Sequence, residues 1–208
     1  MTIPLVLWGG VASAEVIEHI AAVINQTTLI FQSDVERDRT FFAPSPGTDK
    51  NALKRVIDFH LLLMEARRLV PEGPTNSAIA EMQASVRARF PDEKAFEEAL
   101  TQQGLSANRL HEILHERAWV ARFLRERISA LAWVSEKEVE QYAQNHSALL
   151  REKEGIRRPR WIRHFLTVKQ AIRETRKYLA HLRRRAILEI NPKAVRSSKS
   201  LGSVIGIA

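Results

Sequence analysis

Two histidines four residues apart carry the sharpest chemical signal in this chain of 208 residues. The stretch from His111 to His115 reads H-E-x-x-H, which on a helix places two imidazoles on one face for zinc, with Glu112 as general base. Zinc also needs a third ligand, and Ala118 and Ala121 stand where the extended motif has glycine and histidine. The pattern therefore allows a zinc-dependent peptidase, or two histidines on the polar face of an amphipathic helix. We favour the second interpretation, with no metal and no other cofactor.

Large apolar side chains outside the main helical pattern form a second candidate group. Such residues on helices are more often buried than engaged with a ligand. Exposed Met and aromatic side chains nevertheless suit the binding of varied apolar partners. We expect some members of the following set to form a binding surface for polypeptide clients: Met82, Phe90, Phe96, Trp119, Phe123 and Trp133.

The charge of the chain is unevenly distributed along its length. Residues 1–150 hold 16 Lys and Arg against 20 Asp and Glu, a net −4, whereas residues 151–208 hold 16 against 4, a net +12. A basic segment of this kind could contact nucleic acid, lipid headgroups or an acidic client, or could simply be a solvated helix face. We expect a basic rim beside the binding surface, made by Arg163, Arg173, Arg176 and Lys177.

Composition excludes several classes of protein and site. The chain has no Cys, so disulfides, thiolate metal sites and thiol catalysis are excluded. No apolar run reaches the roughly 18 residues that a membrane-spanning helix needs. No phosphate-binding loop, dinucleotide fingerprint or Ser-His-Asp order occurs, and only eight Gly are present. We therefore expect no enzyme activity.

The N-terminus has the composition of an export signal. Residues 3–14 are uncharged and mostly apolar or small, and they end in Ala12-Ser13-Ala14, a pattern that signal peptidase accepts. We expect residues 1–14 to be a signal peptide whose charged beginning is missing, residues 15–191 to be one domain, and residues 192–208 to be a flexible tail. An exported, periplasmic bacterial protein follows from this prediction.

Most of the chain has helical periodicity. Residues 49–70 are apolar on both sides, which predicts a buried central helix. Capping residues predict the starts of the other helices, and Gly104 is a typical helix end. A capping box of Ser33 and Glu36 predicts a first short helix. Further helices are predicted after Thr75 (ending at Phe90), after Asp92, after Ser106, after Ser135 (ending at about Ser147) and after a polar break at 155–159.

Two short regions instead have β-strand character. Residues 17–31 form two apolar stretches broken near Asn25-Gln26, which predicts a hairpin. The run 186–190 is the other β-like segment, and a hairpin alone is marginally stable in water. We therefore predict that 186–190 pairs with the hairpin, giving a mainly α, bundle-like fold with a small antiparallel β element.

These features together resemble a known family. The segment Ala21 to Glu36 and the segment Tyr178 to Ile190, which contains Leu-Arg-Arg-Arg-Ala-x-x-Glu-Ile, resemble the N-terminal chaperone domain of SurA-like periplasmic proteins. The resemblance covers about residues 15–191. It implies that the last β segment joins the N-terminal hairpin and that the last helix packs on the others.

The chain also departs from this family. Its members usually carry a parvulin-type prolyl isomerase domain with a Gly-Gly-Asp-Leu-Gly stretch, and nothing of that kind fits between Val134 and Ile162. The resemblance thus implies an ATP-independent holdase for unfolded secreted or outer-membrane polypeptides, with a separate prolyl isomerase or a second copy as possible partners. The alternatives are the zinc peptidase and a basic adaptor for a membrane surface or, less expected, nucleic acid.

Overall fold

A mainly helical fold with one small antiparallel sheet is seen in the computed structural model, which describes residues 18–43, 51–146 and 157–192. Its elements are β1 (Ile20–Ile24), β2 (Thr28–Phe31), α1 (Gln32–Arg37), the π-helix η1 (Asp38–Phe42), α2 (Ala52–Leu69), α3 (Asn76–Arg87), α4 (Glu93–Gln102), α5 (Ala107–Ser129), α6 (Glu136–Asn145), α7 (Arg157–Arg185) and β3 (Leu188–Ile190). The predicted fold class is therefore confirmed.

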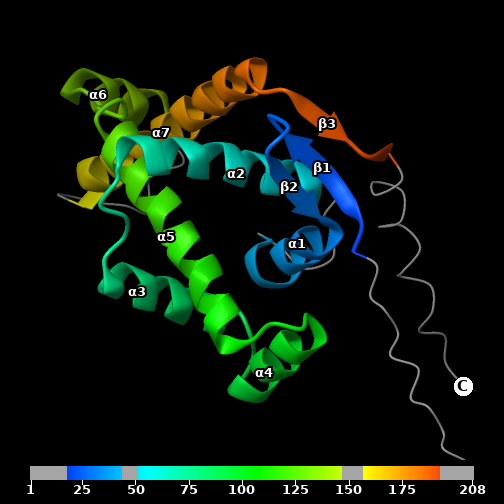
Figure 1. Cartoon of the computed structure of the whole chain (residues 1–208). Helices are drawn as coiled ribbons and strands as arrows, with labels where there is room; N and C mark the ends of the chain where they lie inside the picture. Colours follow the sequence, from blue (N-terminus) through cyan, green and yellow to red (C-terminus); the bar gives the residue numbers. More distant parts are fainter. Residues whose placement is uncertain (1–17, 44–50, 147–156, 193–208) are drawn as a thin grey trace, which may run out of the picture.

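The sheet joins the two ends of the described chain. Its strand order is β2-β1-β3, with both pairings antiparallel (Figure 1). Asn25 and Gln26 adopt positive φ angles of 51° and 60°, and the Thr27 amide donates to the Ile24 carbonyl over 3.1 Å. Two left-handed residues make the tight turn that matches the twist of a hairpin. The predicted hairpin and the predicted added strand are both confirmed, although the strand is shorter than 186–190.

Helix α2 is the centre of the largest core cluster. It lies against the sheet, α5 and the end of α7 (Figure 1). It buries Val56, Ile57, Leu61, Leu62 and Leu63. A second cluster gathers Phe41 with α3, α4 and the first half of α5. A third, smaller cluster joins α6 to the first turns of α7 through Val134, Val139 and Ile162. The buried central helix that the sequence predicts is thus confirmed.

Helix starts follow the sequence at four of the predicted caps. The side chains of Thr75, Asp92, Ser106 and Ser135 each accept a hydrogen bond from the amide three residues later. The capping box at Ser33 and Glu36 is wrong. Helix α1 begins two residues earlier, where the Asp34 carboxylate accepts from the Phe31 amide over 2.9 Å, and Ser33 bonds to Glu18 instead.

Three helix bounds also differ from prediction. Helix α3 ends at Arg87, three residues before Phe90, and α6 ends at Asn145. Helix α7 already begins at Arg157, inside the predicted break, because Pro159 is tolerated in a first helical turn.

The predicted signal peptide and all but the first residue of the predicted tail lie outside the described residues. Among the described helices, none combines the length and hydropathy that a membrane span requires.

Candidate functional site

The six apolar candidates from the sequence do not form one surface. Phe96 and Phe123 are fully buried, each in a different core cluster, and Met82 and Phe90 are half-buried against the cluster around Phe41. These four side chains pack the fold. Since a client cannot reach Phe96 or Phe123 in this structure, neither can belong to an exposed binding surface.

The two tryptophans of the set have opposite environments. Trp119 donates from Nε1 to the Val70 carbonyl over 2.7 Å, and a Cβ at Gly73 would lie 3.7 Å from its ring, an ordinary van der Waals contact. Gly73 has a φ of 65°, so glycine suits this position by its backbone conformation. Trp133, by contrast, is 77% exposed. An indole so exposed to water is unusual, and it makes Trp133 the one member of the set that is available as a contact surface.

The histidine motif lies on α5, as predicted, but its groups are engaged separately. His111 is exposed, Glu112 is ion-paired with Arg109 over 2.7 Å, and the His115 ring packs edge-on against Trp119. Within residues 18–43, 51–146 and 157–192 no group of three His, Asp or Glu side chains is arranged to hold a metal ion. The described residues therefore do not supply the third ligand that a zinc site needs.

The most distinctive exposed apolar feature is on the middle of α7. Phe165, Val168 and Ile172 recur at steps of three and four, so they share one helix face about 10 Å long. All three are among the exposed large hydrophobic residues of the protein. We call these three residues the α7 strip. The strip is exposed because α6 covers only the first turns of α7, and α2 and α5 cover only its end.

Four cations surround the α7 strip. Lys169, Arg173, Arg176 and Lys177 line, together with the strip, a shallow depression of about 590 Å³. Lys177 pairs with Glu174 over 2.8 Å, whereas Lys169, Arg173 and Arg176 form no ion pair with any described residue. Three of the four predicted rim residues therefore do lie beside exposed apolar side chains.

The fourth predicted rim residue has another role. Arg163 bonds to the Glu136 carboxylate and, over 3.4 Å, to the Val134 carbonyl. It thus ties α7 to the start of α6 and does not border the α7 strip.

A neighbouring depression brings Trp133 close to the same cations. It measures about 290 Å³, lies between α6 and α7, and includes Trp133, Tyr142 and Leu166 in its lining. Lys169 and Arg173 line both depressions. The candidate site is therefore a shallow surface around these two cations, with the apolar α7 strip on one side and Trp133 on the other, where Glu138, Gln141 and Asn145 make the lining mostly polar.

The spacing of apolar residues along the last helix could have predicted the α7 strip, which a search for aromatic residues alone did not find. Phe165, Val168, Ile172, Leu179 and Leu182 follow one another at steps of three, four and seven, so the strip continues the face whose end packs into the core at Leu179 and Leu182. Ile162 and Leu166 lie on a different face of the helix, which packs against α6. A helix with two apolar faces and few neighbours has more apolar surface than its core contacts need.

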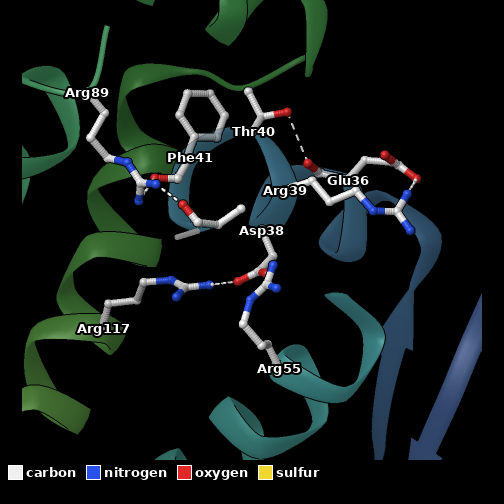
Figure 2. A network of polar contacts seen from close by, with 9 residues as sticks. Glu36, Asp38, Arg39, Thr40, Phe41, Arg55, Arg89 and Arg117 are labelled. Atoms are coloured by element: carbon white, nitrogen blue, oxygen red, sulfur yellow. Dashed lines mark hydrogen bonds and ion pairs between the residues drawn. The ribbon is translucent and has the colours of Figure 1, made fainter. Parts of the chain in front are cut away.

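A cluster of charged side chains around Asp38 was not anticipated from the sequence. Asp38, in η1, is the buried charged residue of the described chain, and its carboxylate accepts from Arg117 of α5 over 2.8 Å and from Arg55 of α2 (Figure 2). The Arg117 guanidinium also stacks on Phe42, at 3.5 Å from the ring centre. One carboxylate thus holds three elements together.

A cleft of about 400 Å³ borders this cluster, between β2, α1, α2 and α5. His60 lines it, and burial holds the pKa of His60 below its ordinary value of 6.5, against the opposing effect of Asp34 and Glu116. The charges around the cleft are largely paired with one another, as in Asp34 with Arg37 and Glu116 with Arg67. The cleft therefore offers few unpaired groups to a ligand, and we assign the cluster to stability.

Comparison with known proteins adds no family assignment. No protein-family model matches the chain, and no curated protein matches it. The resemblance to the SurA-like chaperone domain stays a prediction from the sequence.

Proposed function

We propose that this protein is an ATP-independent holdase that binds unfolded or extended polypeptides on the α7 strip. The observation that carries the proposal is the exposed apolar face of Phe165, Val168 and Ile172 beside Lys169, Arg173 and Arg176. Contiguous exposed apolar surface rimmed by polar residues is typical of interaction sites. Trp133, in the segment before α6, lines a neighbouring depression that shares Lys169 and Arg173 with the strip.

Binding of this kind is expected to be tolerant of sequence. Apolar burial is non-directional and contributes about 25 cal/mol per Å² removed from water, whatever the side chain that covers it. A shallow depression on one helix imposes little shape selection. The proposal therefore predicts many client segments of modest affinity in place of one specific partner.

The cations add a preference for acidic segments. Unpaired Lys and Arg attract carboxylates over roughly the 8 to 10 Å Debye length of physiological salt, and added salt screens this attraction. Exposed ion pairs contribute little to affinity, typically below about 1 kcal/mol. Salt should therefore weaken client binding only modestly, while loss of the apolar strip should weaken it strongly.

The proposal includes export of the protein from the cytoplasm. The expected signal peptide in residues 1–14 would bring the protein to the periplasm, where unfolded secreted and outer-membrane proteins are the available clients. An extended aromatic-rich segment with nearby carboxylates is complementary to the α7 surface.

A membrane-surface adaptor is the second candidate function. An apolar helix strip flanked by Lys and Arg is also the pattern of helices that lie on anionic lipid. Sedimentation with vesicles of anionic and of neutral lipid distinguishes the two candidates. Retention on anionic vesicles without any effect on client aggregation would favour the adaptor.

The test of the holdase is light scattering from an unfolded outer-membrane β-barrel protein diluted out of urea. The variant Phe165→Ser with Ile172→Ser should lose most of the suppression of aggregation that the unchanged protein provides. The matched control is Leu29→Ser with Leu69→Ser, which removes two similarly exposed apolar residues from the sheet and from α2. Equal suppression of client aggregation by the two double variants would refute the proposed site.

A further inference from the structure

The outer edge of β3 has a hydrogen-bonding pattern that fits one kind of partner. Strand β3 is the last strand of the sheet, and none of the other described strands pairs with its outer side (Figure 1). An edge of this type presents backbone N–H and C=O groups that another extended chain can use.

The register shows which residues face outward. The Asn25 amide donates to the Ile187 carbonyl over 2.8 Å, and the Asn191 amide donates to the Ala21 carbonyl over 3.0 Å. In an antiparallel pair, hydrogen-bonded positions alternate with positions whose backbone groups point away. Leu188 and Ile190 therefore direct their N–H and C=O groups away from β1.

Both ends of the β1–β3 pair are fixed by asparagine side chains. Asn25 accepts from the Ile187 amide through Oδ1 over 2.9 Å, and Asn191 donates through Nδ2 to the Ile20 carbonyl over 3.0 Å. The strand is thus held extended before any partner arrives. A preformed strand needs little further ordering on binding, which lowers the entropic cost of the encounter.

Side chains at this edge favour an apolar partner with carboxylates. Ile187 and Ile190 are 57% and 50% exposed. Arg184 and Arg185, directly before β3, are exposed and form no ion pair with any described residue. The two isoleucines are three positions apart and so lie on opposite faces of the strand, where successive side chains of a second extended chain laid along β3 would contact both. That chain would end near the two cations.

We propose that the outer edge of β3 accepts an extended polypeptide segment as a fourth strand, with apolar residues over Ile187 and Ile190 and carboxylates toward Arg184 and Arg185. The inference rests on the proposed function only for the class of partner, an unfolded polypeptide. Strand addition gives affinity through main-chain hydrogen bonds and is therefore tolerant of sequence. Two outward-facing residues supply few bonds, so binding is weak and reversible, as a holdase requires.

The test measures, by fluorescence anisotropy, the binding of a fluorescein-labelled decapeptide to the full chain. The peptide consists of alternating Val and Thr with Glu at both ends. The variant Ile190→Pro removes an outward N–H without touching a bond to β1, and proline is tolerated where an edge N–H faces solvent. We expect it to weaken binding by about three- to tenfold, the range for one net hydrogen bond. The matched control, Ile190→Val, keeps the N–H and should bind within about twofold.

A second measurement keeps the inference testable if Ile190→Pro does not fold. The same peptide with backbone methyl groups on alternate amide nitrogens cannot pair with an edge. It should lose binding to the unchanged protein if the edge is used, and equal binding of methylated and unmethylated peptides would overturn strand addition. A dimer of the protein that dissociates in Ile190→Pro, without peptide binding, would also overturn it and assign the edge to a second copy.

Failure of this inference is distinguishable from failure of the holdase. If Ile190→Pro leaves peptide binding unchanged while Phe165→Ser with Ile172→Ser abolishes aggregation suppression, strand addition is wrong and the α7 site stands. If Ile190→Pro weakens peptide binding while aggregation is suppressed by no form of the protein, the edge accepts strands and the holdase function is wrong.

Discussion

Arg183, near the end of α7, donates from Nε to the Asp58 carboxylate of α2 over 2.6 Å. Both side chains are partly buried, and Tyr178, one turn and a half before Arg183, donates to Glu65 of α2 over 3.0 Å. These contacts link residues more than a hundred positions apart. The last helix is therefore part of the central core and not an appendage, even though its middle is open to solvent.

Removal of residues 160–208 should unfold the protein. The deletion takes Ile162 and Leu182 from two core clusters, the partner of Asp58, and the strand that pairs with β1. A two-stranded hairpin without that strand is marginal in water. Thermal unfolding followed by circular dichroism should then show no cooperative transition, and a sharp transition in the truncated chain would contradict this account.

Asp38 is expected to matter more for stability than any surface carboxylate. Replacing Asp38 with Ala leaves Arg117 and Arg55 without their shared acceptor in a buried site, which typically costs about 3–5 kcal/mol of unfolding free energy. Urea denaturation measures the loss. Glu98→Ala removes an exposed ion pair with Lys94 and should cost less than about 1 kcal/mol. Similar losses for the two variants would show that Asp38 has no special role.

His60 should make stability depend on pH. Its folded pKa is lowered, mainly by burial, so below its ordinary pKa of 6.5 the unfolded chain binds a proton that the folded chain resists. The free energy of unfolding should therefore fall as the pH drops from about 7.5 through 6.5. Asp34 and Glu116 favour the charged form and Arg67 and Arg117 oppose it, but burial dominates.

The variant His60→Gln isolates this contribution. Its unfolding free energy should change less between pH 7.5 and 5.5 than that of the unchanged protein, as measured by urea denaturation at each pH. Exposed His164→Gln controls for the loss of one histidine. An equal pH slope in His60→Gln and the unchanged protein would remove His60 as the cause.

The fold was largely predictable because local signals and pairing requirements agreed. Thr75, Asp92, Ser106 and Ser135 each have a capping oxygen at the correct spacing, and the β-like run after α7 had one available partner. The capping box at Ser33 failed because Asp34 offers a competing carboxylate one residue later. Two acceptors that close together cannot be ranked without knowledge of the strand before them.

The site was only partly predictable, since burial depends on the neighbours that tertiary packing provides. Phe96 and Phe123 lie on helices and are fully buried, whereas Trp133 lies in the segment between α5 and α6 and is widely exposed. Arg173, Arg176 and Lys177, which the charge distribution singled out, line the depression beside the strip. Asp38 gave no signal, because a single carboxylate in an amphipathic segment resembles a surface residue until its two arginines are placed.

The histidine pair on α5 should be dispensable for function. His111 is exposed, and His115 contributes one ring contact to Trp119. The double variant His111→Ala with His115→Ala should keep full suppression of client aggregation and lose about 1 kcal/mol of stability at most. Plasma emission spectrometry on tag-free protein provides the second readout. Stoichiometric zinc that disappears in the variant together with activity would restore the metal-site interpretation.

Site-specific photo-crosslinking tests the central claim most directly. A benzophenone amino acid placed at Val168, in the middle of the α7 strip, reports whether an unfolded client lies against that surface. Leu69, on α2, is the matched position because the two side chains are equally exposed, at 44% and 42%. We predict strong crosslinks to the unfolded β-barrel client from position 168 and weak ones from position 69. Equal crosslinking from both positions, or none from position 168, would contradict the assignment of client binding to the α7 strip.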